Sequence, residues 1–230
     1  MFRIVVAVLV ALVAIQARAQ MTGSATFVSD YRFRGVSLSD DRPAAQLSLD
    51  YDWPGSGWYA GGMMSNVRLD SRHSAQLLAY AGYVHRINAN LSWESGVRYT
   101  RFTGHDSYAY PEAYAGFAFR QLVGRIYYAP SYFNAGYNAW YAELNNSHAL
   151  TEKWYAFAHV GYLRRGGDVA EYHAVRFRSD FRAGVGLVLQ PCTFQLSWGT
   201  VRGASDAVLG YPSAAGTTRN AWVLSISYAW

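Results

Sequence analysis

The last ten residues of the chain, 221–230, alternate strictly between two kinds of side chain. One face carries Trp222, Leu224, Ile226, Tyr228 and Trp230, whereas the residues between them are small or weakly polar. A period of two over ten residues predicts a β-strand, and ten tilted residues suffice to cross a bilayer core. The large apolar face favours contact with lipid and the small face favours a polar lumen. The last strand of a soluble β-sandwich is the alternative.

Alternating segments of this kind recur along the chain, separated by turn residues, and none shows a helical period of 3.6 over several turns. They predict twelve strands, near residues 23–34, 44–53, 58–67, 75–86, 91–102, 110–119, 123–132, 139–149, 154–163, 175–189, 192–201 and 221–230. The connections are sorted by length: short turns at 54–57, 87–90, near 121, at 150–153 and near 191 alternate with longer loops, including 35–43 and 68–74. Alternation of short turns with long loops indicates a transmembrane barrel, which has short turns at one end and long loops at the other. The fold of a β-sandwich imposes no such alternation.

Tryptophan lies only near the ends of the predicted strands. Aromatic residues make up 17% of the chain, and all eight Trp flank turns, loops or the C-terminus. Tyr and Trp favour the level of the lipid headgroups, so two belts of indole rings at the two interfaces explain this placement. A sandwich would place Trp centrally, where burial is greatest.

The N-terminus has the three parts of a secretory signal peptide. Arg3 is followed by an apolar run over residues 4–15 and by the cleavage motif Ala17-Arg18-Ala19. We therefore expect a signal peptide over residues 1–19 and one barrel domain over residues 20–230. No later apolar run reaches 18 residues, so a helical membrane span in the mature chain is not expected.

Strand parity assigns the charged side chains to the lumen. In the first predicted strand Ala25, Phe27, Tyr31 and Phe33 face lipid, and the charges between them face inward. Outward charge at mid-bilayer costs about 2–4 kcal/mol, so this sorting is expected. The candidate pore-lining residues are Asp30, Arg32, Arg34, Asp50, Asp52, Glu94, Arg98, Glu112, Glu143, Arg176, Arg178, Asp180 and Arg182. Arg120 and Arg125 are also counted as lumenal.

Two charged clusters are expected inside the barrel, one joining residues 30–34 to Asp50 and Asp52, the other at residues 176–182. Each could be a charged constriction that steers ionic solutes, or an ion-pair network that holds strands in register and fills the interior. Arginines and carboxylates are nearly balanced, so neither anion nor cation selectivity is predicted.

The sequence gives little support for catalysis or for a bound cofactor. The six His show neither H-x-x-x-H nor H-E-x-x-H spacing, so no metal site and no cofactor are predicted. The loop residues His105, Asp106 and Ser107 come nearest to a hydrolytic triad, although adjacent loop residues rarely form one. Cys192 is single and cannot form an internal disulfide.

The segment Val28-Ser-Asp-Tyr-Arg-Phe-Arg-Gly-Val-Ser37 is followed by Ser39-Asp-Asp41, Pro43-Ala44 and Gln46. These residues, within 27–52, resemble the opening of the TorF family of putative porins, and weaker similarities follow up to Phe133. A terminal aromatic residue is similar to the C-terminal signature of outer-membrane barrels. The chain departs from the family pattern at Tyr110-Pro-Glu112. The resemblance implies an outer-membrane porin of unassigned substrate, with Asp30, Arg32, Arg34 and Gly35 at the barrel mouth.

The sequence thus predicts an all-β protein, a twelve-stranded antiparallel up-and-down barrel in the outer membrane of a Gram-negative bacterium, with both termini periplasmic. The predicted function is passive diffusion of small polar or charged solutes through a narrow lumen lined by Arg and carboxylates. The alternatives are a structural barrel acting through its loops and, less favoured, a lipid-modifying enzyme. Expected partners are outer-membrane lipid, small polar solutes, and periplasmic chaperones and barrel-assembly machinery during biogenesis, but no nucleic acid.

Overall fold

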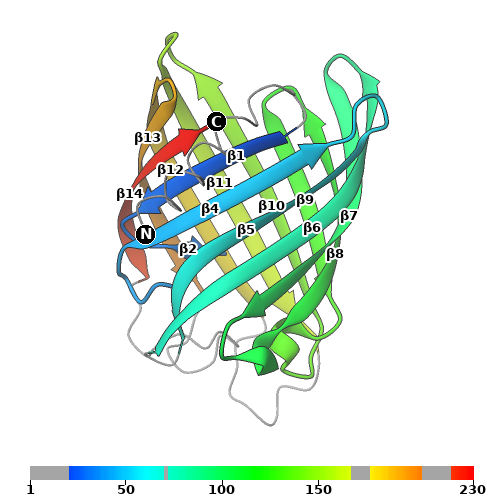
Figure 1. Ribbon diagram of the computed structural model, residues 1–230, viewed down its shortest axis with the longest axis vertical. Helices are drawn as coiled ribbons and strands as arrows, with labels where there is room; N and C mark the ends of the chain where they lie inside the picture. The colour runs from blue at the N-terminus through cyan, green and yellow to red at the C-terminus, as the bar shows by residue number, and fades with distance from the viewer. Residues whose placement is uncertain (1–20, 70–71, 167–176, 204–218) are drawn as a thin grey trace, which may run out of the picture.

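The chain forms a closed antiparallel barrel of twelve strands (Figure 1). The computed structural model describes residues 21–69, 72–166, 177–203 and 219–230, so the expected signal peptide lies outside the described residues. The wall strands are β1 (Met21–Val28), β4 (Ala44–Asp52), β5 (Trp58–Leu69), β6 (Arg72–Asn88), β7 (Leu91–Phe102), β8 (Tyr110–Phe119), β9 (Leu122–Ala129), β10 (Ala139–Ala149), β11 (Trp154–Arg165), β12 (Phe177–Leu189), β13 (Cys192–Arg202) and β14 (Asn220–Ala229). Among the described residues, no helix is long and apolar enough to cross a membrane.

The first and last wall strands close the barrel. β1 pairs with β14 from Ser24↔Ala229 to Val28↔Ser225, and the backbone of Gly23 exchanges two hydrogen bonds with that of Trp230, of 3.1 and 3.0 Å. Every wall strand therefore has a neighbour on each side, which leaves no unpaired sheet edge. The twelve-stranded up-and-down barrel predicted from the sequence is confirmed.

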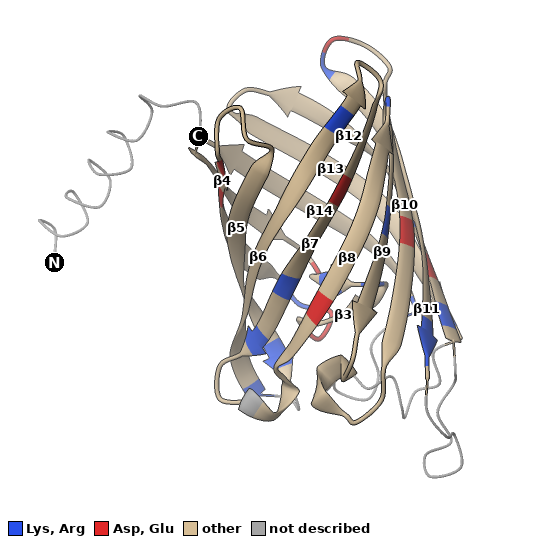
Figure 2. Cartoon of the chain, turned by 90° about the vertical axis from the view of Figure 1, so that its right-hand side faces the viewer, with Lys and Arg blue, Asp and Glu red and all other residues tan. Residues whose placement is uncertain are grey.

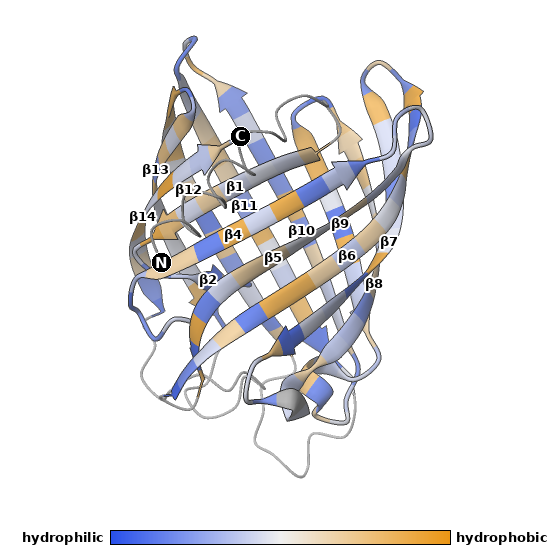
Figure 3. Ribbon diagram, viewed as in Figure 1, coloured by the Kyte–Doolittle hydropathy of each residue, from blue (hydrophilic) through white to orange (hydrophobic). Residues whose placement is uncertain are grey.

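The outer face of the wall is apolar. Hydropathy alternates along the strands (Figure 3), and large apolar side chains stand exposed on the outside of every wall strand, among them Phe27, Leu47, Val97, Leu144 and Leu224. Trp53, Trp58, Trp93, Trp140, Trp154, Trp198 and Trp222 are exposed as well, near the ends of the strands. A water-soluble sheet would bury such residues, so the outer surface is suited to lipid.

The two ends of the barrel differ in their connections. The end with both strand termini, Met21 and Ala229, has short connections such as residues 89–90, 120–121 and 190–191; we call it the turn end. The other end, the loop end, has longer connections such as residues 29–43, 103–109 and 130–138. The sequence overestimated the loop at 68–74, because β5 and β6 continue to a Leu69↔Arg72 pair.

The first predicted strand was too long. It ends at Val28 rather than near residue 34, and residues 29–43, which we call the plug loop, enter the barrel. The plug loop contains a small hairpin of β2 (Arg32–Phe33) and β3 (Val36–Ser37) that is not part of the wall (Figures 1 and 2). Tyr31 and Phe33 therefore pack against the buried interior cluster, and their predicted contact with lipid is wrong.

The lipid-facing side of β14 gives a direct test of the assigned faces. We expect Leu224→Arg, in the middle of the strand, to lower the free energy of unfolding in lipid vesicles by about 2–4 kcal/mol. Asn220→Arg, on the same face at the strand end, is the matched control and should cost about 0–1 kcal/mol because the side chain reaches the interface. Urea titration of the folded barrel measures both; equal losses would contradict the assignment.

Candidate functional site

The tip of the plug loop is a two-residue hairpin turn. Phe33 pairs with Val36, and the two residues between them, Arg34 and Gly35, have φ of 51° and 80°. Positive φ at both positions is the geometry that joins strands most tightly in a hairpin. Gly35 is also constrained by space, because a β-carbon there would lie 2.5 Å from Asp180 Cβ. The turn therefore directs the Arg34 side chain into the lumen while Gly35 lies against β12.

Asp30 connects the two arms of this hairpin. Its carboxylate accepts hydrogen bonds from the Ser37 hydroxyl at 2.6 Å and the Ser39 hydroxyl at 3.2 Å, and it forms an ion pair with Arg32 at 2.9 Å. Asp30 is only 6% exposed, so these partners replace the water that a carboxylate needs. Hydrogen bonds and an ion pair to one carboxylate thus hold the two arms of the hairpin together.

Glu112 of β8 anchors the hairpin tip to the wall. One carboxylate oxygen is 2.8 Å from Arg34 Nη2, and the other accepts from Arg98 Nε at 2.6 Å. The Glu112 and Arg34 side chains are 1% and 3% exposed, so the three groups form a buried charge cluster. One carboxylate thus contacts both guanidinium groups.

Aromatic rings surround this cluster. The Arg34 guanidinium lies 4.2 Å from the centre of the Tyr141 ring, and that of Arg98 lies 4.3 Å from the Tyr127 ring. Phe33 contacts both cations, at 5.0 and 5.5 Å. Ring faces attract cations in a desolvated site, so these rings add to the stabilisation of the two guanidinium groups.

The loop end of the lumen is packed with apolar side chains. Val36 and Leu38 of the plug loop lie in one cluster with wall residues including Val67, Leu69, Phe102 and Tyr110, and with Tyr132 and Phe133 of the short helix η3 (Tyr132–Asn134). The Tyr31 hydroxyl donates to Gln76 Oε1 at 2.8 Å, and burial raises the pKa of that hydroxyl. The plug loop is thus held by a hydrophobic core as well as by charge.

A chamber lies on the turn-end side of the hairpin. Its volume is about 520 Å³, and its wall is formed by the hairpin tip and by inward residues of β7 and β9 to β13. Its charged lining residues are Arg32, Arg34, Arg98, Arg125, Arg182, Glu143 and Asp180. The ion-pair partners Asp30, Glu94 and Glu112 bring arginines and carboxylates into balance.

Asp180 and Arg182, both on β12, project into this chamber with different partners. Asp180 contacts His159 Nε2 at 2.8 Å and accepts from the Tyr141 hydroxyl at 3.2 Å, and His159 Nδ1 is 2.7 Å from the Asn145 side-chain oxygen. Arg182 is exposed to the chamber and lies 5.6 Å from the Phe157 ring; within the described residues it makes no hydrogen bond or ion pair. Its charge is therefore accessible to a solute.

A second polar network lies nearer the turn end. Glu94 pairs with Arg125 and accepts a 2.7 Å hydrogen bond from Tyr59, whose hydroxyl also contacts that of Tyr114 at 2.7 Å. Tyr80 donates to Asp50 of β4. The Tyr80–Asp50 bond joins β6 to β4, and the contacts of Tyr59 and Glu94 join β5, β7, β8 and β9. Most of the chamber lining comes from β9 to β13.

The structure brings together some of the predicted site residues and separates others. Arg34, Arg98 and Glu112 meet, although they come from three distant segments, and Glu143 and Asp180 share the chamber wall. The predicted cluster of residues 30–34 with Asp50 and Asp52 is wrong, because antiparallel pairing places Asp50 opposite Thr22, toward the turn end. Arg178 is buried, at 1% exposed, and Arg176 lies outside the described residues.

Other predictions from the sequence need correction or addition. Arg120 is not lumenal: it lies in a tight turn with its guanidinium 5.5 Å from the ring of the outward Phe119. Parity indicated that Tyr141 faces inward, but Tyr127 and the inward His159 were missed. Parity could have indicated Tyr127, which lies on the same face as Arg125, and His159, which alternates with outward Val160. Aromatic residues on both faces of β11 concealed the signal for His159.

The residues considered for catalysis lie at the rim of the loop end. The His105 ring stacks on Tyr108 at 5.8 Å, and its Nδ1 is 3.4 Å from the Thr103 carbonyl oxygen. Ser107 is exposed. Within the described part of the chain, no group of three or more His, Cys, Asp or Glu side chains could hold a metal ion.

Residues 15–230 match a family described as "Bacterial protein of unknown function (Gcw_chp)". The chain belongs to this family. The description of the matching family does not mention TorF, so membership of the TorF family stays a prediction. No curated protein matches the sequence.

Solved structures with a similar fold include two porins. KdgM porin aligns with a TM-score of 0.59 and 11% identity over 91% of this chain and 99% of KdgM. NanC porin aligns with a TM-score of 0.56 and 10% identity over 90% of this chain and 98% of NanC. A further KdgM structure, described as "in complex with disordered oligogalacturonate", aligns with a TM-score of 0.57 and 10% identity, over 91% of this chain and 99% of that one. At such low identity the similarity establishes the fold alone.

Removing the anchor of the plug loop should destabilise the barrel. Glu112→Gln leaves two buried guanidinium groups without their carboxylate, so we expect a loss of about 3–5 kcal/mol in the free energy of unfolding. Glu94→Gln removes a carboxylate whose partner Arg125 is 38% exposed and should cost only about 1 kcal/mol. Urea titration in vesicles compares the two; an equal cost would show that the buried cluster is not the main anchor.

Proposed function

We propose that the protein is an outer-membrane channel of Gram-negative bacteria that passes small polar or charged solutes. The observation that carries the proposal is the charged chamber inside a closed barrel with an apolar outer face. The fold that the chain shares with KdgM and NanC porins supports the same role, as does the resemblance to TorF porins. In this orientation the turn end, with both termini, faces the periplasm and the loops face outward.

The chamber wall is suited to solutes that carry charge. Arg182 offers an accessible cation, while Asp180 and Glu143 offer carboxylates nearby. In a narrow passage with low-dielectric walls, such groups act strongly on an ion because little water screens them. The charges of the chamber and of its ion-pair partners sum to zero, but they are separated in space. This arrangement favours small solutes that carry both hydrogen-bond donors and acceptors over simple ions of one sign.

The plug loop is the constriction of the proposed channel. Its tip extends from Glu112 on β8 to Asp180 and Val201 on β12 and β13, and so crosses the lumen. A solute entering from the loop end must pass the hairpin or displace it. The conductance of the channel is therefore set by how firmly Arg34 and its partners hold the tip.

A second candidate function is a non-conducting barrel that acts through its outer loops. The full burial of Leu38, Phe102, Tyr110 and Tyr132 around the plug loop favours this alternative. The two candidates differ in one measurable property, because only a channel passes ions while the hairpin is in place.

Loosening the hairpin should raise the conductance measured in planar lipid bilayers. We expect small single-channel conductance for the wild type, and several-fold larger values for Arg34→Ala and for a variant with residues 32–37 replaced by two glycines. Arg42→Ala, an exposed change in the same loop, is the matched control and should conduct like the wild type.

Two results of this experiment would count against the proposal. If neither the wild type nor the hairpin variants conduct while remaining folded, the non-conducting barrel is the better assignment. If the wild type conducts and the hairpin variants do not differ from it, the plug loop lies away from the pathway.

Reversing one accessible charge in the chamber should change ion selectivity. We expect Arg182→Glu to shift the reversal potential in a salt gradient toward cation preference, since it replaces an accessible cation with an anion. Arg164→Glu, on the outer face of the neighbouring strand β11, is the control and should leave the reversal potential unchanged. Arg178 is a poor choice for this test because its side chain is buried. An unchanged potential in Arg182→Glu would place the chamber outside the conducting path.

A further inference from the structure

Four arginines occupy equivalent positions on the outside of the wall at the loop end. Each is the last or second-last residue of a strand that runs toward this end: Arg68 of β5, Arg101 of β7, Arg164 of β11 and Arg202 of β13. The register places them on the outer face, since Arg164 pairs with the exposed Trp140 and Phe177, and Arg101 pairs with the exposed Leu77. We call these four residues the arginine ring. Figure 2 shows basic residues near the loop ends of the strands.

Negative charge is kept off this surface. All six carboxylates of the described wall strands, Asp50, Asp52, Glu94, Glu112, Glu143 and Asp180, share the inward parity of their strands. Arg68 instead donates a 2.9 Å hydrogen bond to Nε2 of His73, so this contact of its guanidinium group is not with a carboxylate. Among the described strand residues, the charged side chains on the outer rim of the loop end are therefore basic.

The arginine ring lies just beyond a belt of aromatic side chains. Tyr99 and Tyr162 precede Arg101 and Arg164 by two residues, and Trp198 precedes Arg202 by four, always on the same face. Outward Tyr and Trp of a barrel lie at the level of the lipid headgroups. A guanidinium group one step farther out reaches the level of lipid phosphates, with which it forms strong paired hydrogen bonds.

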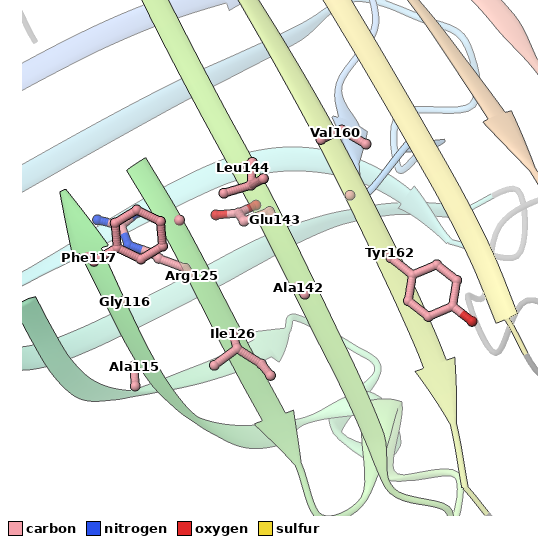
Figure 4. Close-up of a pocket in the computed structure, with 12 residues that line it drawn as sticks. Ala115, Gly116, Phe117, Arg125, Ile126, Ala142, Glu143, Leu144, Val160 and Tyr162 are labelled. Carbon is pink, nitrogen blue, oxygen red and sulfur yellow. The ribbon is translucent and has the colours of Figure 1, made fainter. Parts of the chain in front are cut away.

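Two apolar grooves on the outer face lead toward the ring. One, of about 630 Å³, follows Leu47, Met64, Leu77 and Tyr99 and includes Arg101 in its wall. The other, of about 560 Å³, crosses β8 to β11 between Phe117, Ile126, Leu144, Val160 and Tyr162 (Figure 4). Small residues form its floor, and the Phe117 ring lies over Gly124, where a β-carbon would collide with it. Tyr162 is two residues from Arg164 on the same face, so an apolar chain in this groove would have its headgroup near that guanidinium.

We propose that the arginine ring binds the phosphate groups of lipid A, the phosphorylated glycolipid of the outer leaflet, and that the two grooves hold its acyl chains. This inference rests on the proposed outer-membrane location, in which the loop end faces outward. The match is one of charge, because four guanidinium groups and no described strand carboxylate face the level where the lipid carries its phosphates. The same contacts would fix the depth of the barrel in the membrane.

Native mass spectrometry of the full mature barrel, titrated with lipid A in detergent, tests the proposal. Each arginine near a membrane surface contributes about fivefold to the binding of anionic lipid, so we expect Arg101→Gln with Arg164→Gln to weaken lipid A binding about 30-fold. Lipid A stripped of its phosphates should bind the wild type at least as weakly as intact lipid A binds this variant, because it loses the contacts of all four arginines. A second pair, Arg164→Gln with Arg202→Gln, provides the measurement if the first pair folds poorly.

The matched control removes two charges from the opposite end. Arg120 and Lys153 lie in turns at the turn end, and Arg120→Gln with Lys153→Gln should leave lipid A binding within about twofold of the wild type. Gel electrophoresis in detergent without prior heating verifies that every variant is folded, because a folded barrel resists unfolding under these conditions. Equal binding by the ring variants, or an equal loss in the control pair, would overturn the proposal.

The outcome is independent of the channel test. Conductance of the Arg101→Gln, Arg164→Gln protein should equal that of the wild type, because both side chains lie outside the lumen. Lost lipid A binding with retained conductance supports both proposals. If the ring variant binds lipid A like the wild type and the protein conducts, only the lipid proposal is contradicted. If lipid A binding depends on its phosphates but neither the wild type nor any variant conducts, only the channel proposal is contradicted.

Discussion

Closure of the sheet gives every backbone group of the wall a hydrogen-bonding neighbour strand. In a bilayer, a backbone N–H or C=O group without a partner costs several kcal/mol, because no water is present to replace the missing bond. The pairing of β1 with β14 removes the last free edge, and only then can the outer face consist of apolar side chains. Closure also encloses a volume that the inward side chains must fill or leave open to water.

The interior of this barrel is divided rather than uniform. At the loop end, the plug loop supplies Val36 and Leu38 to a hydrophobic cluster, much as a segment of a soluble protein would enter a core. Toward the turn end, tyrosines and carboxylates form hydrogen-bonded networks around an open chamber. A twelve-stranded barrel is too wide to be filled by its wall side chains alone, and the inward loop takes up part of the remaining space.

Glu112 links these two parts of the interior. Its carboxylate lies between Arg34 of the plug loop and Arg98 of the wall, and the aromatic rings of Tyr127, Tyr141 and Phe33 enclose the pair of cations. A buried group of this kind is weak evidence for stability, since the desolvation of charge opposes the attraction. Its clearer consequence is specificity: the hairpin tip has one position in which all three charges are satisfied.

Local alternation of side chains accounts for most of the wall strands and for the faces they present. The alternation of side chains set the bounds of segments such as residues 91–102, 110–119 and 139–149, which the structure reproduces. Lipid imposes one rule on every outward position, so parity in the sequence translates directly into orientation. Because the alternating pattern marks where each strand ends, the short turns and the longer loops could be told apart along most of the chain.

The tertiary structure alone decided what occupies the lumen. Tyr31, Arg32, Phe33 and Arg34 continue the alternation of β1, and nothing local distinguishes a wall strand from a loop that turns inward. Apolar side chains can be buried by lipid outside or by a packed interior inside, and both surroundings give the same pattern. The meeting of Arg34 with Glu112, and of His159 with Asp180, likewise depends on the fold of the plug loop and on strand register, which bring together residues 78 and 21 positions apart.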